Sequence, residues 1–174
     1  MCRTVLILCG AVLTGGVVVP MHAQEPTAGA PVACGVAKYT QFDFWIGDWE
    51  VRGPNGVLQG TNSISKIEGG CVLQELWTSA AGGTGRSLNI YDFTRDVWHQ
   101  TWVSGSTLLV LEGGFVDGEM VLQGTTVGQG GAITHNRITW TPVSDTVVTQ
   151  VWDTSPDGDT WTTIFNGRYT RTGR

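Results

Sequence analysis

The sequence predicts an all-β protein, an antiparallel up-and-down β-barrel of about ten strands with a short N-terminal helix or 3-10 segment as a plug. Charged residues are few (14%) while Gly (25) and Trp (8) are abundant, a composition typical of β-proteins. From Asp48 onward, short strand-forming stretches alternate with tight turn sequences at even spacing. Directly before them, Gln41–Val51 (QFDFWIGDWEV) carries four aromatic residues, which suits the floor of a barrel.

The N-terminal stretch has the features of a signal peptide. Arg3 supplies a positive charge, Thr4–Pro20 is apolar, and Ala23 ends the expected cleavage site. The apolar run is short for a membrane-spanning helix. We therefore expect residues 1–23 to be a signal peptide, residues 24–40 a Pro/Ala/Gly linker or arm, and residues 41–172 the barrel domain of a periplasmic or secreted protein.

The predicted strands are separated by turn-forming sequences, of which Gly53–Gly56 and Asp117-Gly118 are the clearest. Short, even spacing favours pairing between strands that are consecutive in the chain, and closing the sheet removes its exposed edges. In order, the expected strands are Trp49–Arg52, Val57–Ile67, Cys71–Ser79, Arg86–Tyr91, Val97–Val103, Thr107–Phe115, Glu119–Val127, Ala132–Pro142, Thr146–Asp153 and Thr160–Arg171.

Two cysteines follow the expected cleavage site, Cys34 and Cys71. In an exported chain, a disulfide is the default for such a pair. It would tie the N-terminal arm to the start of a strand. The alternative, a pair of metal ligands, has little support because the pair does not form a C-x-x-C motif.

The net charge of the chain indicates which classes of partner to expect. A net charge of −5 and a pI of about 5.0 offer no attraction to nucleic acid or to anionic lipid. We expect no nucleic-acid partner, no membrane association after signal cleavage, and a monomer or homodimer.

Gly47-Asp48-Trp49, at the start of the first expected strand, resembles the G-x-W motif of lipocalins and the wider calycin group. In those proteins the Trp closes the barrel floor and an Arg from the last strand stacks on it. The resemblance implies structural roles for Gly47 and Trp49, and a stacking role for either Arg168 or Arg171.

A longer series of motifs resembles exported bacterial proteins of the DUF1579 type: FDFWIGDWEV, GCVLQELW, SLNIYD, WHQTWV, LEGG, RITWTP and TTIFNGRYTR. The resemblance covers about Phe42 to Arg171. It implies a lipocalin-like barrel and export, and the biochemical role of that family is unassigned. Related ten-stranded barrels, the nitrobindin-like ones, bind haem through a His.

Alternation along the strands predicts which side chains share a face. If the large aromatic residues mark the inner face, the lumen is a Trp/Tyr wall with sparse polar groups, which is typical of a small-molecule pocket. Trp161, Phe165 and Tyr169 would share this face on the last strand. The alternative is a barrel packed solid by its own side chains. The candidate ligand-binding residues are Glu75, Trp77, Asn89, Tyr91, Trp98, Gln100, Trp102, Trp140, Gln150 and Trp152.

Glu75 is the candidate for chemistry. A carboxyl group among Trp side chains should have a raised pKa because burial disfavours its charged form, and such a group can act as a general acid or base near neutral pH. The other interpretation is a structural Glu75 hydrogen-bonded to Asn89 or Gln100.

Haem is the one cofactor considered, and otherwise none is expected. The two histidines beyond the expected signal peptide are His99 and His135. Both fall on the face opposite the Trp markers, where a surface or hydrogen-bonded role is the simpler one. His135, near a loop end, is the better haem candidate.

Three functions therefore remain open. The first is an exported lipocalin-like barrel that binds a small apolar or aromatic molecule. The second is an isomerase or lyase of the same fold that uses Glu75 as its acid/base. The third is a nitrobindin-like haem protein, and a role without any ligand also stays open.

Overall fold

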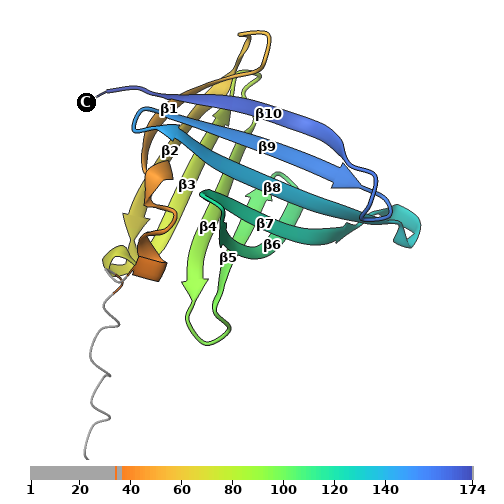
Figure 1. Ribbon diagram of the computed structural model, residues 1–174. Coiled ribbons are helices and arrows are strands. Elements are labelled where there is room, and N and C mark those ends of the chain that lie inside the picture. Colours follow the sequence, from red (N-terminus) through yellow and green to blue (C-terminus); the bar gives the residue numbers. More distant parts are fainter. Residues whose placement is uncertain (1–33, 35–36, 174) are drawn as a thin grey trace, which may run out of the picture. The chain divides into compact units, whose positions relative to one another are not determined.

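The computed structural model describes Cys34 and residues 37–173; the expected signal peptide and most of the expected linker lie outside the described residues. Within them, ten antiparallel strands form a closed barrel, so the predicted fold class is confirmed. Strands consecutive in the chain are neighbours, and β1 pairs with β10 to close the sheet (Figure 1). No helix in this part of the chain is long and apolar enough to cross a membrane.

The strands match the expected order, with small shifts at their ends. They are β1 (Gly47–Arg52), β2 (Leu58–Ile67), β3 (Val72–Ser79), β4 (Thr84–Asp92), β5 (Val97–Ser104), β6 (Thr107–Val116), β7 (Glu119–Val127), β8 (Ile133–Ser144), β9 (Val147–Ser155) and β10 (Thr162–Arg171). Four 3-10 helices accompany them: η1 (Ala37–Thr40), η2 (Asp43–Trp45), η3 (Glu68–Gly70) and η4 (Gln129–Gly131).

Two differences from the expected strands have local causes. β4 begins at Thr84 and not at Arg86, because the Ser79 amide donates to the Gly83 carbonyl and shortens the preceding turn. β10 carries a bulge between Thr163 and Phe165. A bulge breaks the two-residue alternation. Trp161 precedes β10 and packs under the Arg137 guanidinium, away from the inner face, so its expected place beside Phe165 is wrong.

The plug at one end of the barrel is aromatic. η1 lies in the stretch expected as a linker, yet it buries Tyr39 against Tyr91. In η2, the Trp45 ring stacks on Phe42 with 5.0 Å between centroids, and both side chains are fully buried. Trp140 of β8 contacts both rings, at 5.2 Å and 5.4 Å. This end of the barrel is therefore filled by its own side chains.

The G-x-W motif joins the first strand to the last. Trp49 donates its Nε1 hydrogen to the Trp45 carbonyl (2.9 Å), and the Arg171 guanidinium lies over its ring at 4.4 Å. Arg171 also donates to the carbonyls of Ile46 (2.7 Å) and Asp145 (3.2 Å). Gly47 has φ +139, and an added Cβ would lie 2.0 Å from Arg171 Nη1, so glycine is required there. Arg171, and not Arg168, occupies the stacking position.

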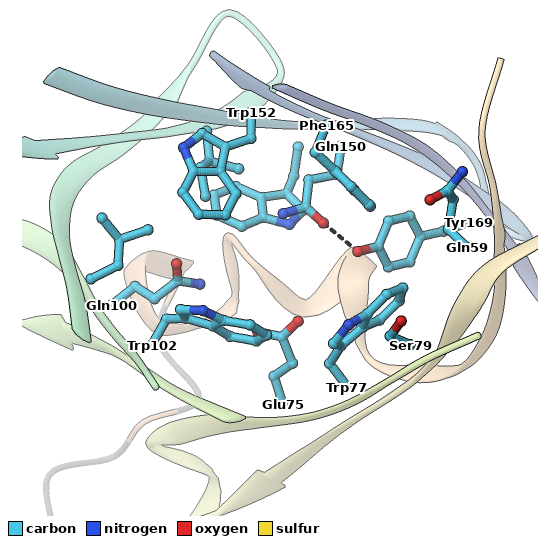
Figure 2. A pocket seen from close by; sticks show the side chains of 13 residues that line it. Gln59, Glu75, Trp77, Ser79, Gln100, Trp102, Gln150, Trp152, Phe165 and Tyr169 are labelled. Atoms are coloured by element: carbon cyan, nitrogen blue, oxygen red, sulfur yellow. Dashed lines mark hydrogen bonds between the residues drawn. The ribbon is translucent and has the colours of Figure 1, made fainter. Parts of the chain in front are cut away.

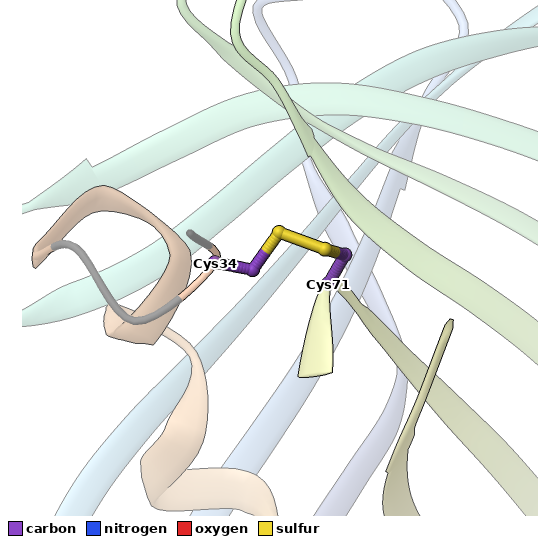
Figure 3. The surroundings of a disulfide bond; sticks show 2 residues. All are labelled: Cys34 and Cys71. Carbon is purple, nitrogen blue, oxygen red and sulfur yellow. A yellow bond between two sulfur atoms is a disulfide. The ribbon is translucent and has the colours of Figure 1, made fainter. Parts of the chain in front are cut away.

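A disulfide connects Cys34 to Cys71, at the start of β3 (Figure 3). The two cysteines are separated by 37 positions, and the loop they close contains the plug, β1 and β2. A cross-link of this kind removes conformations from the unfolded chain and is worth about 4 kcal/mol in the chain-entropy model. The bond therefore holds the aromatic arm against the barrel end.

Replacing Arg171 by Ala should lower the free energy of unfolding by about 2 kcal/mol. The substitution removes a stacking interaction worth about 1 kcal/mol and hydrogen bonds to two carbonyl groups. Urea denaturation followed by fluorescence measures the change. Arg168→Ala, an exposed position on the same strand, is the control and should change the value by less than about 0.5 kcal/mol. Equal effects of the two substitutions would contradict a closing role for Arg171.

Candidate functional site

The end of the barrel opposite the plug contains a cavity of about 250 Å³ (Figure 2). Its floor is formed by Trp140 and Tyr169, which are fully buried and contact the plug residue Trp45 from the other side. Its upper wall is aromatic and partly exposed, comprising Trp77, Trp102, Trp152 and Phe165. Polar side chains reach it from five positions: Gln59, Glu75, Ser79, Gln100 and Gln150. Leu109 and Ile138 complete the lining.

Two glycines make room for the aromatic wall. An added Cβ on Gly85 would lie 1.9 Å from the Trp102 ring, and one on Gly167 would lie 2.7 Å from the Phe165 ring. The Trp102 ring therefore lies over Gly85 of the adjacent strand β4, and the Phe165 ring lies over Gly167 of its own strand β10, each in space that a larger side chain would occupy. This arrangement keeps the rings at the wall and leaves the centre of the lumen open.

Glu75 of β3 points into the cavity from the wall between Trp77 and Trp102 (Figure 2). Each carboxyl oxygen accepts one hydrogen bond: Oε1 from Asn62 Nδ2 (2.8 Å) and Oε2 from Ser87 Oγ (2.6 Å). Both donors come from the flanking strands β2 and β4. Glu75 is thus held in one orientation by two neutral groups.

A second layer of hydrogen bonds supports Ser87. Asn89 Nδ2 donates to Ser87 Oγ (2.9 Å) and to the Leu73 carbonyl (3.2 Å). Gln100 Nε2 donates to Asn89 Oδ1 (2.7 Å). The chain of donors runs from Gln100 through Asn89 and Ser87 to Glu75, so the expected contacts of Glu75 with Asn89 or Gln100 are indirect.

Burial changes the pKa of the Glu75 carboxyl group. Desolvation raises the pKa of Glu75 from 4.5 to about 7, and the hydrogen bonds from Ser87 and Asn62 oppose that rise without cancelling it. The side chain therefore exchanges a proton near neutral pH. No charged side chain stands among the lining residues besides Glu75.

Other polar atoms at the cavity floor retain bonding capacity. Tyr169 donates its hydroxyl hydrogen to Gln150 Oε1. Burial, and then the nearby Glu75, raise the pKa of Tyr169 well above its usual value, so the side chain stays a neutral phenol. Trp140 Nε1 and Asn62 Oδ1 are buried without a hydrogen-bond partner. Buried polar groups normally find partners, so these two atoms are exceptions among the buried polar groups near the cavity floor.

The candidate ligand-binding residues divide into two groups. Those that line the cavity are Glu75, Trp77, Gln100, Trp102, Trp140, Gln150 and Trp152. The other three lie elsewhere. Asn89 is behind the lining, in the layer that supports Ser87, while Tyr91 and Trp98 pack at the plug end with Tyr39 and Phe42. The barrel interior is therefore a packed core at one end and a pocket at the other.

Neither described histidine faces the cavity. His99 lies on the outer wall, where its ring nitrogens contact Glu112 (3.0 Å) and Thr101 (2.9 Å). His135 lies on the outer side of β8, beside Gly158 and Trp161. Among the described residues, none of the histidines that could ligate a haem iron reaches the lumen, so the residues present do not fit a haem bound there.

Several cavity residues were not among the sequence candidates. Phe165 and Tyr169, expected on the inner face of the last strand, do line the cavity, and alternation alone is sufficient to place them there. Asn62 and Ser87, which hold Glu75, carry a signal that alternation could have provided. Asn62 is the cross-strand partner of Trp77, and Ser87 is the cross-strand partner of Glu75. Both therefore occupy inward positions, on β2 and β4.

Comparison with models of protein families gives no match, and comparison with curated proteins gives no significant match. The resemblance to proteins of the DUF1579 type therefore stays a prediction from the sequence motifs.

The raised pKa of Glu75 predicts a pH-dependent stability. Between about pH 4.5 and 7, the folded protein retains a proton on Glu75 that the unfolded chain releases, so the unfolding free energy falls as the pH rises through this window. Glu75→Gln carries no ionisable group there. Relative to that variant, the wild type should lose up to about 3 kcal/mol between pH 4.5 and 8. Urea denaturation of both proteins at several pH values measures it; a constant difference between them would contradict the shift.

Proposed function

We propose that this protein is an exported lipocalin-like barrel that binds a small molecule with an apolar or aromatic body in its lumen. The observation that carries the proposal is the open cavity at one barrel end, with an aromatic wall and a single buried carboxyl group (Figure 2). Mostly apolar cavities with a few convergent polar groups are the usual form of small-molecule sites.

The size of the cavity supports a ligand of one or two rings. A cavity of about 150 Å³ is enough to hold benzene, and this one measures about 250 Å³. The half-buried rings of Trp77, Trp102 and Trp152 offer flat faces to a planar or compact apolar body. The amide groups of Gln100 and Gln150, which line the cavity, would bond one polar end of the ligand.

Export to the periplasm or secretion is part of the same proposal. The Cys34–Cys71 disulfide supports it, because such bonds persist in oxidising compartments.

Gly85→Ala should weaken binding at least tenfold. The new Cβ would overlap the Trp102 ring and displace it into the lumen. We expect tert-butylbenzene, a compact neutral aromatic probe, to quench tryptophan fluorescence of the wild type and to bind this variant poorly. Gly83→Ala is the matched control, because its Cβ would meet no atom closer than 3.9 Å. Equal binding by both variants would argue against the cavity as the site, and the absence of binding by the wild type would overturn the proposal.

A second candidate function is proton transfer. Glu75, with its pKa of about 7, lines a cavity that a substrate could enter, which is the arrangement a general acid or base requires. The reaction class would be an isomerisation or elimination at a carbon next to an electron-withdrawing group. Asn62 and Ser87 would hold the carboxyl group in place through the step.

Native mass spectrometry of protein purified from a periplasm identifies any molecule that remains bound. Under the second candidate function, the wild type in D2O should exchange a C–H hydrogen of that molecule for deuterium. Glu75→Gln should stop the exchange while the thermal midpoint at pH 5 stays within a few degrees of the wild type. Exchange that persists in the variant would contradict a catalytic Glu75.

A further inference from the structure

The cavity has an unbalanced charge. Among its described lining residues, Glu75 and Tyr169 are the ionisable groups, and none is Lys, Arg or His. Tyr169 stays a neutral phenol. When Glu75 is ionised, the lumen therefore carries one negative charge without a cation beside it.

The described residues behind the lining do not supply a counter-ion either. The partners of Glu75 from β2 and β4, Asn62 and Ser87, are neutral hydrogen-bond donors. From the strands across the lumen, the groups that face the cavity are the neutral Trp140, Gln150 and Tyr169. Arg171, on the inward side of β10, donates to two carbonyl groups and stacks on Trp49. An ionised Glu75 is thus a buried charge that only a ligand can pair.

The walls around Glu75 offer the other half of a cation site. Trp77 and Trp102 flank the carboxyl group on the same wall, and Trp152 and Phe165 line the other side of the cavity (Figure 2). The faces of aromatic rings carry negative electrostatic potential and attract cations, most strongly when water is excluded. Quaternary ammonium groups are bound in proteins by aromatic walls of this kind.

We propose that the ligand is an organic cation, a substituted amine or quaternary ammonium compound whose charge lies against Glu75 and whose apolar body lies between the Trp rings. This inference rests on the proposed function and specifies the class of ligand. A neutral ligand would leave Glu75 either protonated or unpaired. A cation removes that cost, and its alkyl groups suit a cavity of about 250 Å³ that is too apolar for a hydrated metal ion.

Two probes of the same shape test the inference. Phenyltrimethylammonium is a cation, and tert-butylbenzene replaces its nitrogen by carbon without the charge. At pH 8 the wild type should bind the cation at least tenfold more tightly than the neutral probe, as measured by fluorescence quenching and checked by calorimetry.

Glu75→Gln should remove this preference while it retains the neutral probe. Once the Asn62 amide turns over, the Gln amide can donate to Asn62 Oδ1 and keep accepting from Ser87, so the variant is expected to fold. Binding of tert-butylbenzene confirms its fold independently. Glu112→Gln, which removes a partly exposed carboxylate from the outer wall, is the matched control and should leave both affinities unchanged.

The pH provides a readout that a purely structural Glu75 would not give. Between pH 8 and pH 5.5 Glu75 becomes protonated, since its pKa is about 7. The preference for phenyltrimethylammonium should therefore shrink severalfold, with no matching change for tert-butylbenzene, because neither probe titrates in this range.

The outcomes separate the two proposals. Binding of tert-butylbenzene with equal or weaker binding of the cation would overturn the cation inference and leave the proposed function standing. A cation preference that survives in Glu75→Gln or stays constant with pH would also overturn it. Failure of both probes to bind would overturn the proposed function and the inference together.

Discussion

A closed ten-stranded sheet encloses more volume than the side chains at its inner face can fill, and this protein fills that volume at one end only. Phe42 and Trp45 of the plug enter the lumen and pack on Trp140. The floor they create supports Tyr169, which in turn limits the cavity. The plug therefore determines where the barrel is core and where it is a site.

The open end of the barrel depends on where glycines, aromatic residues and Glu75 are placed along the strands. Small residues such as Gly85 and Gly167 stand where larger ones would fill the lumen; the Trp102 ring of the adjacent strand lies over Gly85, and the Phe165 ring of the same strand lies over Gly167. Against this wall, Glu75 remains ionisable because Asn62 and Ser87 bond both of its oxygens without neutralising it. The aromatic wall and the polar groups around Glu75 thus come from successive inward-facing positions of the same strands.

Much of this architecture could be predicted from the sequence. Alternation between turns gave the number and order of the strands, and Glu75 was singled out because it falls among Trp residues on one face. The division of the lumen into a packed end and an open end could not be predicted. Trp98 and Trp102 both point inward from β5, yet Trp98 lies at the packed end and Trp102 at the open end. Alternation along a strand predicts which face of the sheet a side chain is on, whereas its position along the barrel axis depends on the stagger of all ten strands. The bulge in β10 misplaced Trp161 for a related reason, since it changes the parity locally.

The topology has a consequence for the order in which the chain folds. Every pairing but one joins strands that are consecutive in the chain, and such hairpins close short loops at low entropic cost. The exception pairs Trp49 with Arg171, across nearly the whole length of the domain. Hairpins can therefore assemble one after another while the sheet is still an open ribbon, and the ring is sealed last. The stacking of the Arg171 guanidinium on the Trp49 indole forms only when the barrel is complete, and it then holds the first and last strands together.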